Sequence, residues 1–296
     1  MSNTWTGLGI GTKDSTGEWL EMFFSEEKIS SSDINSSSKI LEKVIVNDSE
    51  APSSVPEAYL KLHLLSYRLV KPNETNLDCL FGFLKNIVWT SEGPFSVDDF
   101  RKKQMVTKKV NKHILVHSVD KFPRMTDYVI LSDVRIADAN RVRLGAYLGP
   151  GTTVMHEGFV NFNAGSLGEA MTEGRISQGV VIGDKTDIGG GASTMGTLSG
   201  GNEVKISLGK NCLLGANSGL GIPLGDRCTV EAGLYLTAAS KVEIVNDQGE
   251  ITTILKASEL SSKSDLLFIR NSLTGSIQCR PNKNVAKLNE ELHSNE

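Results

Sequence analysis

Large aliphatic residues recur at every sixth position from residue 130 onward. An unbroken first run is followed by three later runs with the same spacing: Ile130, Ile136, Val142, Leu148, Val154, Val160; then Ile176, Ile182, Ile188; then Leu208, Leu214, Leu220; then Leu224, Val230, Leu236, Val242. The next residue is usually small, most often glycine. A period of six is neither the 3.6 of an α-helix nor the 2 of a strand, and an internal repeat outweighs local propensity. The segment is therefore expected to consist of one repeated unit.

The simplest structure with this period is a coil with three flat sides. Each side holds six residues, a short strand and a tight corner, with the aliphatic residue pointing inward and the small residue allowing the chain to turn. Successive coils then stack as parallel strands about 4.8 Å apart. The glycines agree with this interpretation, because 21 of the 29 lie between Gly145 and Gly233.

Composition excludes several classes of protein. The formal net charge of −4 argues against a nucleic-acid-binding protein, which usually carries a basic excess. No stretch approaches the ~18–20 apolar residues of a membrane span, and the first residues lack the basic and apolar regions of a secretory signal. The four cysteines show neither close pairing nor metal-ligand spacing. We therefore expect a cytoplasmic protein with reduced thiols and with no nucleic-acid or membrane partner.

Residues 1–108 are expected to form an α/β domain. Apolar residues near the 3.6 period predict a helix over 55–70, and Ser96 followed by acidic residues predicts the start of another. Residues 18–25 are a candidate helix. The basic run 101–110 is interpreted as a solvated helix end, with a surface for an anionic ligand as the alternative.

The repeat segment resembles the hexapeptide repeats of the left-handed parallel β-helix acyltransferases. The resemblance is carried by the units IADANR, VRLGAY, LGPGTT, VMHEGF and VNFNAG. It implies a left-handed coil, a hand that the spacing itself does not reveal, since parallel crossovers are usually right-handed. The expected architecture is an N-terminal α/β domain (1–108), a left-handed parallel β-helix (109–245) and a short C-terminal β-rich segment (246–296).

Three interruptions of the six-residue spacing are expected to carry function, because loops inserted into a rigid scaffold often do. They are a polar, flexible excursion at 166–175, a glycine-rich one at 196–204 and a short slip at 221–223. These regions hold the motifs TEGRIS, MGTLSGG and NSGLGIPLGD. Through these motifs, most of 130–245 resembles the tetrahydrodipicolinate N-succinyltransferases of the diaminopimelate and lysine pathway.

The resemblance implies transfer of a succinyl group from succinyl-CoA to the amino group of an acyclic amino-oxo-dicarboxylate. Such a reaction needs a base, because an α-amine is protonated at pH 7, and a fixed N–H donor for the charge that develops on the thioester carbonyl. Glu173 matches the family's catalytic glutamate, and Gly196 matches the glycine whose backbone N–H faces the oxyanion. The alternatives are a solvated glutamate and a glycine needed for backbone conformation.

Because coenzyme A is long, its contacts are expected to be spread along the coil. By resemblance they come from Arg175, Gly190, Ser193, Ala216, Glu231, Ala232, Ala239, Arg270, Asn271 and Ser272. Small residues suit a shallow groove for the pantetheine arm, but they equally suit coil packing. Arg175 also suits a structural ion pair.

The resemblance also bears on metal binding and assembly. Some relatives hold a divalent ion on a threefold axis through two acidic residues, and the matching positions here are Glu157 and Asn140. Losing one carboxylate weakens an oxygen-ligand site, so no metal is expected. Because the family is trimeric, we expect a homotrimer whose active sites lie between subunits, with Glu173 facing a groove shared with the adjacent chain.

Other functions are compatible with the repeats. Many hexapeptide acyltransferases use a histidine base, and His156 lies inside the repeats, so a histidine-dependent acetyltransferase acting on a sugar or another amine is the main alternative. A zinc carbonic anhydrase of this fold needs three histidine ligands, which His156 supplies only if His113 or His117 joins it. A non-catalytic β-helix scaffold is the alternative from another class.

Overall fold

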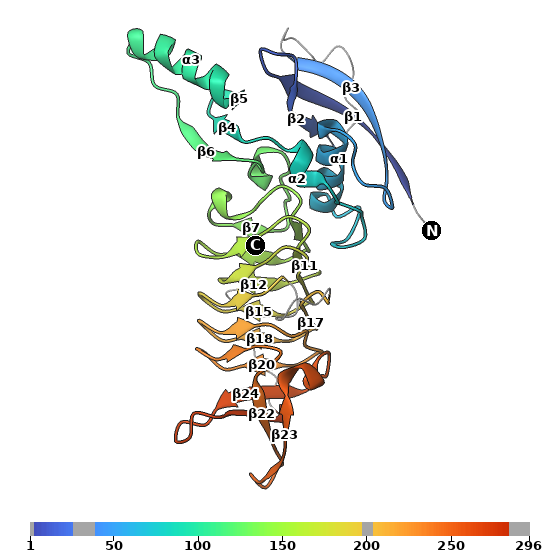
Figure 1. Ribbon diagram of the computed structural model, residues 1–296, viewed down its shortest axis with the longest axis vertical. Coiled ribbons are helices and arrows are strands. Elements are labelled where there is room, and N and C mark those ends of the chain that lie inside the picture. The colour runs from blue at the N-terminus through green and yellow to red at the C-terminus, as the bar shows by residue number, and fades with distance from the viewer. Residues whose placement is uncertain (1–2, 26–38, 197–203, 284–296) are drawn as a thin grey trace. The chain divides into compact units, whose positions relative to one another are not determined.

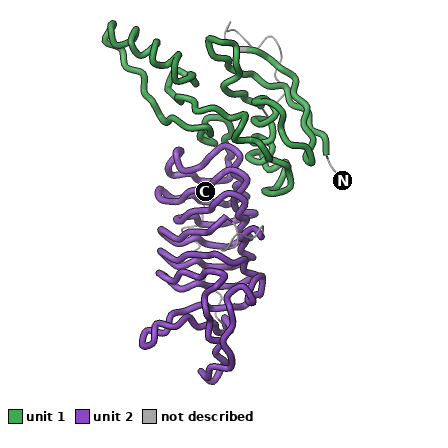
Figure 2. Tube along the Cα trace, in the orientation of Figure 1, with its two compact units in different colours: residues 1–130 green, residues 131–296 purple. Residues whose placement is uncertain are grey.

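The chain forms two compact units, residues 1–130 and residues 131–296 (Figure 2). The computed structural model describes residues 3–25, 39–196 and 204–283 (Figure 1). Of the three predicted interruptions, the one at 196–204 lies mostly outside the described residues. Among the described residues, no helix is both long and apolar enough to cross a membrane.

Unit 1 begins with an antiparallel sheet in the order β2-β1-β3. Its elements are β1 (Thr4–Lys13), β2 (Trp19–Phe24), β3 (Lys39–Asn47) and the following helix α1 (Val55–Ser66). The helix predicted over 55–70 is confirmed by α1, where Ser54 caps the N-terminus by accepting the N–H of Glu57 at 3.3 Å. The helix considered for 18–25 is wrong. That segment is β2, because its pairing with β1 overrides local propensity.

Three glycines on β1 explain how this sheet packs. Gly7, Gly9 and Gly11 alternate along the strand, so they share one face. A Cβ atom at each would collide with side chains of Phe24, Met22 or Trp19, at 2.5–2.7 Å. The glycine face of β1 therefore lets the large side chains of β2 lie flat across it.

The rest of unit 1 is a second antiparallel sheet, β5-β4-β6, with two helices. The bounds are α2 (Leu80–Phe83), β4 (Ile87–Thr90), β5 (Gly93–Ser96), α3 (Val97–Lys109) and β6 (Val116–Asp120). The helix start predicted at Ser96 is confirmed, since its hydroxyl accepts the N–H of Asp99 at 3.2 Å. Because β6 pairs with β4, unit 1 extends to residue 130, beyond the predicted boundary at 108.

Unit 2 is a coil of parallel strands that visits three sheets in turn. Sheet I contains β7 (Arg135–Ile136), β9 (Thr152–Val154), β12 (Ala170–Thr172), β15 (Asp187–Ile188), β18 (Leu213–Leu214) and β20 (Thr229–Val230). Sheet II contains β10 (Phe159–Val160), β13 (Arg175–Ile176), β16 (Ser193–Thr194), β19 (Gly219–Leu220) and β21 (Tyr235–Leu236). Sheet III contains β8 (Tyr147–Leu148), β11 (Gly165–Ser166), β14 (Val181–Ile182) and β17 (Ser207–Leu208).

The aliphatic positions of the repeat form the core of this coil. From Val142 to Val242, each of them is at most 3% exposed. Truncating such a residue to alanine typically costs about 2–5 kcal/mol of unfolding free energy. Ile130 is the exception, because it is 85% exposed at the end of unit 1 and takes no part in the coil.

The predicted excursion at 166–175 is wrong as an inserted loop. This stretch contains the end of β11, all of β12 and the start of β13. Ser166 and Thr172 occupy the inward positions where the aliphatic pattern skips, and both are 0% exposed. Small hydroxyl side chains fill these positions, so a pattern that counts only aliphatic residues reads continuous coil as an interruption.

What does change along the coil is the length of particular corners. Phe159 pairs with Arg175, a coil of 16 residues, whereas Ala170 pairs with Thr152, a coil of 18. The shortened corner lies between Thr172 and Ile176, and a second one spans the predicted slip at 221–223, where Leu208 bridges to Leu224. The long coil is the one in which Val181 pairs with Ser207, so the insertion falls at the predicted region 196–204.

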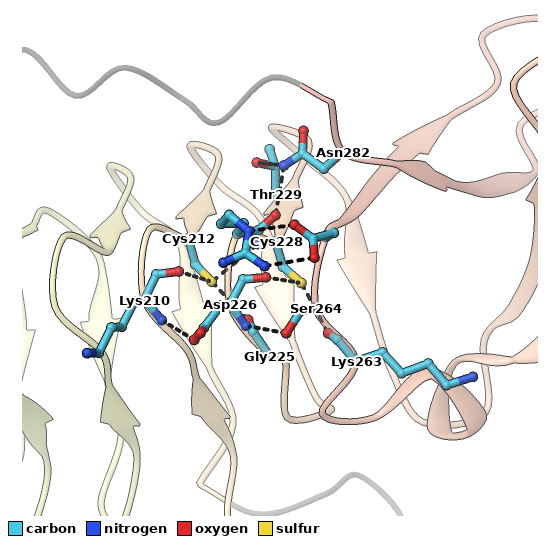
Figure 3. A network of polar contacts seen from close by, with 11 residues as sticks. Lys210, Cys212, Gly225, Asp226, Cys228, Thr229, Lys263, Ser264 and Asn282 are labelled. Atoms are coloured by element: carbon cyan, nitrogen blue, oxygen red, sulfur yellow. Dashed lines mark hydrogen bonds and ion pairs between the residues drawn. The ribbon is translucent and has the colours of Figure 1, made fainter.

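The C-terminal segment extends sheet I. It consists of β22 (Lys241–Val245), β23 (Ile251–Lys256), β24 (Leu266–Arg270) and β25 (Ile277–Pro281), and β24 lies parallel to β20. Arg227 binds Asp265 through two hydrogen bonds of 2.6 and 2.9 Å, and the Asn282 amide reaches Thr229 (Figure 3). These contacts attach the segment to the coil.

Buried thiols complete the corner shown in Figure 3. The Sγ of Cys212 donates to the Gly225 carbonyl at 3.1 Å and accepts the N–H of Cys228 at 3.4 Å. The Sγ of Cys228 in turn donates to the Lys263 carbonyl at 3.3 Å. All four cysteines of the chain are free thiols. Cys212 and Cys228 therefore stitch neighbouring coils together by hydrogen bonds.

Candidate active site

One edge of the coil collects many of the residues predicted to bind coenzyme A. We define the I–II edge as the corners that lead from a sheet I strand to the next sheet II strand, at 155–158, 173–174, 189–192, 215–218 and 231–234. Successive corners stack because successive strands pair in parallel. On this edge lie Glu173, Gly190, Ala216, Glu231 and Ala232. Residues far apart in the chain thus share one continuous surface.

Glu173 occupies the shortest of these corners. Between β12 and β13 the chain has only Glu173 and Gly174, and both backbone N–H groups donate to the Ile188 carbonyl, at 2.8 and 3.1 Å. A side chain on Gly174 would meet the Ala192 carbonyl oxygen at 2.4 Å, so only glycine fits. The corner therefore holds the Glu173 backbone in a fixed position.

The Glu173 carboxylate reaches across to the next corner. Its Oε2 atom lies 3.5 Å from where a Cβ on Gly190 would stand, and the side chain is half-buried. No other atom lies within 4 Å of that Cβ position. The missing side chain of Gly190 leaves open space beside the carboxylate, in which an amine could approach.

Arg175 and Ser193 meet on the adjoining face of sheet II. They are paired residues of β13 and β16, and the Arg175 Nη2 donates to the Ser193 Oγ at 2.6 Å. Arg175 is exposed while Ser193 is buried, so the hydroxyl anchors a guanidinium whose remaining donors face solvent. These donors can bind a carboxylate or phosphate.

The I–II edge continues into the C-terminal segment. Val230 pairs with Phe268, so Arg270 stands one level beyond Ala232. The Glu231 Oε2 accepts the backbone N–H of Arg270 at 2.7 Å. The loop that follows holds Asn271 and Ser272, and it is closed by a bond of 3.0 Å from the Arg270 Nη1 to the Gly275 carbonyl. The three predicted residues 270–272 thus extend the same edge.

Two predicted residues lie elsewhere. Gly196 follows β16 and Ala239 follows β21, so both stand beyond the opposite ends of sheet II strands, on what we call the II–III side. Gly196 lies against Gln178, whose carbonyl oxygen is 3.1 Å from the Cβ position. Counting ~3.3 Å per residue along β16, Gly196 is on the order of 15 Å from the Glu173 corner of the same chain.

Two family models match the chain. Residues 205–238 match the hexapeptide repeat of succinyl-transferase, and residues 84–124 match the middle region of tetrahydrodipicolinate N-succinyltransferase. Curated relatives named 2,3,4,5-tetrahydropyridine-2,6-dicarboxylate N-succinyltransferase occur in Vibrio cholerae and Pseudomonas putida. The first is 58% identical, covering 85% of this chain and 74% of the relative, and the second is 44% identical, covering 99% of each.

The chain belongs to the 2,3,4,5-tetrahydropyridine-2,6-dicarboxylate N-succinyltransferase family. It is thus an acyltransferase, as the sequence analysis predicted. A solved structure from Campylobacter jejuni, described as a 2,3,4,5-tetrahydropyridine-2-carboxylate N-succinyltransferase, is similar with a TM-score of 0.85 and 29% identity, covering 95% of this chain and 93% of the other.

In this N-succinyltransferase, the rival base His156 lies on the same edge as Glu173. It stands in the corner 155–158, is exposed, and is neighboured by Met155, whose N–H donates to the Thr172 carbonyl at 2.9 Å. His156 and Glu173 therefore occupy successive corners. Their positions do not separate the two candidate bases, so their roles have to be tested.

The positions compared with a metal site of the family are Glu157 and Asn140. Asn140 uses its backbone N–H and its amide to bind the Asp138 carboxylate, at 2.9 and 3.0 Å, and Glu157 is exposed. Among the described residues, no three His, Cys, Asp or Glu side chains gather into a group able to hold a metal ion.

One feature of the N-succinyltransferase site escaped the sequence analysis. The short corner at Glu173 exists because the chain needs only four steps from Thr172 to Ile176, the same spacing as from Leu220 to Leu224. Recognising Thr172 as an inward residue would have revealed this corner, because the spacing of four then appears twice.

Proposed function

We propose that this chain transfers the succinyl group of succinyl-CoA to the amino group of the acyclic form of tetrahydrodipicolinate, a step of the diaminopimelate and lysine pathway. One observation carries the proposal: the residues matched to coenzyme A contacts align along the I–II edge, next to a carboxylate held over open space at Gly190. The aligned, motif-specific residues favour this function over a non-catalytic scaffold.

In the proposed reaction, Glu173 takes a proton from the acceptor ammonium group. The free amine attacks the thioester carbonyl, a new C–N bond forms, and the carbonyl oxygen becomes an oxyanion. The backbone N–H of Gly196 stabilises that charge. Collapse of the intermediate breaks the C–S bond, releases the thiolate of coenzyme A and leaves the succinyl group on nitrogen as an amide.

We place coenzyme A along the I–II edge. From the Glu173 corner to Arg270 the edge rises four strand spacings, about 19 Å at ~4.8 Å each. Exposed Ala216 and Ala232 make this track shallow, which suits an extended pantetheine arm. Arg175, anchored by Ser193, supplies cationic donors for an anionic group of the acyl-CoA.

We further propose that the coil is left-handed, as in the acyltransferases that its repeats resemble, and that the enzyme is a homotrimer. The trimer follows from a distance. A base and an oxyanion donor must each come within about 3 Å of adjacent reacting atoms, whereas Glu173 and Gly196 of one chain are on the order of 15 Å apart. The I–II edge of one subunit would therefore face the II–III side of its neighbour.

A second candidate function is a histidine-dependent acetyltransferase, because His156 occupies the next corner of the same edge. Release of coenzyme A from succinyl-CoA and from acetyl-CoA, with tetrahydrodipicolinate as the acceptor, tests both. We expect turnover with succinyl-CoA that falls by about 10²–10⁴-fold in Glu173→Gln, with His156→Asn as the matched variant that retains it. Loss of turnover in His156→Asn only, or preference for acetyl-CoA, would overturn the proposal.

A further inference from the structure

Unit 1 contains a cavity that the proposed acyl transfer does not use. Its volume is about 950 Å³, and its walls come from β1, β2, β4, β5 and α3 together with the stretch that precedes residue 129. Asp99 closes part of the rim by accepting the backbone N–H of Ser15 at 2.9 Å and its hydroxyl at 2.6 Å. This volume falls within the range of small-molecule sites.

A buried carboxylate lies in the cavity wall. Glu21 is 7% exposed, and its Oε2 accepts the phenol O–H of Tyr128 at 3.0 Å. The Tyr128 ring stands between two other aromatic rings of the wall, with centroid distances of 6.3 Å to Trp89 and 6.4 Å to Phe23. A carboxylate beside aromatic faces is the combination that recognises ammonium groups.

The charge of the wall has the same sign. Five carboxylate residues line the cavity, against three lysines and arginines. Of these basic side chains, Lys103 is paired with Glu92 at 2.7 Å and Arg124 with Asp127 at 2.8 Å. The remaining excess is negative, so the cavity favours cationic ligands.

A hydroxyl behind this wall lacks a hydrogen-bond partner. The Tyr59 O–H is completely buried and unpaired, and its ring lies 5.9 Å from that of Tyr128. Burial and the nearby Glu21 carboxylate raise the pKa of both Tyr59 and Tyr128 well above the usual value, so both phenols stay neutral. An unpaired buried hydroxyl next to Glu21 points to a polar group or water that the protein itself does not supply.

From this geometry we propose that the cavity is a binding site for small primary alkylammonium compounds. The ammonium group hydrogen-bonds to Glu21 and lies against the rings of Trp89 and Tyr128, while the methylene chain contacts Phe23 and neighbouring apolar wall residues. The site is separate from the acyl-transfer edge, since all of its residues belong to unit 1.

Binding of n-pentylammonium chloride to the full chain tests this proposal. All three tryptophans, Trp5, Trp19 and Trp89, are in unit 1, so calorimetry can be combined with tryptophan fluorescence. We expect a dissociation constant of about 1 mM, and no comparable binding of sodium pentanoate, which has the same chain length and the opposite charge. Equal binding of the two compounds, or no binding of n-pentylammonium at about 10 mM, overturns the proposal.

The variant Glu21→Gln isolates the carboxylate. It keeps the size and a hydrogen-bonding oxygen for Tyr128, and we expect it to weaken n-pentylammonium binding at least about tenfold. Glu42→Gln, on β3 and away from the cavity, removes the same charge and should bind like the parent chain. Unchanged affinity in Glu21→Gln contradicts the proposal. The comparison of the two ions uses only the parent chain, so it decides the question even if Glu21→Gln does not fold.

Discussion

The Glu231 carboxylate holds the backbone of Arg270 across the I–II edge, with 2.7 Å between Oε2 and the amide nitrogen. The two residues are 39 positions apart, and they join the last coil to the loop after β24. That loop carries Asn271 and Ser272, both matched to coenzyme A contacts. A carboxylate placed next to the phosphates of coenzyme A would repel them, so we infer that Glu231 acts by positioning this loop rather than by binding the coenzyme through its charge.

Removing the Glu231 side chain should therefore weaken the binding of acyl-CoA. Loss of a hydrogen bond to a charged group costs about 1–3 kcal/mol, and we expect Glu231→Ala to raise the KM for succinyl-CoA about tenfold with little change in kcat. Glu231→Gln keeps an acceptor oxygen and should restore the KM. Glu259→Ala, which breaks a similar carboxylate–backbone bond to Lys256, is the matched control. Equal KM values for the Gln and Ala variants would contradict the positioning role.

The shortened corner at Gly174 makes a second prediction. A methyl group there would stand 2.4 Å from the Ala192 carbonyl oxygen, so Gly174→Ala must shift the corner that carries Glu173. We expect kcat to fall at least tenfold and the unfolding free energy to fall by about 1–3 kcal/mol. Gly82→Ala is the control, because nothing lies within 4 Å of its Cβ position. Steady-state kinetics and thermal unfolding measure both effects, and an active Gly174→Ala variant would argue against a base at Glu173.

Mixed oligomers test whether the site is shared between subunits. Glu173→Gln removes the base, and Gly196→Pro removes the N–H donor, so each homotrimer should be inactive. In an equimolar mixture that is unfolded and refolded together, each mixed trimer has one interface with both intact groups, so about a quarter of the parental activity should return. Each variant refolded by itself is the control. No recovery in mixtures shown to contain mixed trimers would place both groups in one chain or exclude one of them.

The buried His63 predicts how the stability of unit 1 depends on pH. Its Nδ1 lies 2.7 Å from the Tyr59 carbonyl oxygen, its Nε2 accepts the Phe24 N–H at 3.3 Å, and burial lowers its pKa from 6.5 to about 4. The unfolded chain binds a proton near pH 6.5 while the folded chain does so only near pH 4. Stability contributed by neutral His63 is therefore present above pH 6.5 and is lost as pH falls toward 4, by about 3 kcal/mol in total.

Urea unfolding followed by tryptophan fluorescence measures this effect, because all three tryptophans lie in unit 1. The variant His63→Gln is expected to be less stable at pH 7 but to lose less stability between pH 6.5 and pH 4 than the parent chain. Carboxylates that titrate in the same range contribute equally to both proteins and cancel in the difference. Parallel pH profiles would rule out His63 as the source of the slope.

The repeat could be predicted because each inward position of a coil meets the same environment, and aliphatic side chains fill it at a fixed spacing. Ser166 and Thr172 escaped this logic because small hydroxyl groups can also be buried once they find or tolerate local partners. Ser166 lies 2.5 Å from the Thr152 hydroxyl, for example. A pattern of hydrophobicity does not distinguish such a position from a loop.

The strand at Trp19–Phe24 was mistaken for a helix for a different reason. Its residues are compatible with either structure, and what decides between them is antiparallel pairing with β1, where Ile10 lies opposite Phe23. The glycine face of β1 makes that pairing possible by admitting Phe24 and Met22. Neither effect can be read from residues 18–25, because both depend on a neighbouring strand.

The sequence by itself determined the coil, its interior and, through family-specific motifs, the candidate residues Glu173 and Gly196. These follow from period and residue type, which are local properties of the chain. Only the tertiary structure decided which candidates share a surface. Stacking of parallel strands aligns corners 16, 18 or 26 residues apart, and so it gathers Glu173, Gly190 and Glu231 on one edge while leaving Gly196 on the other side of sheet II.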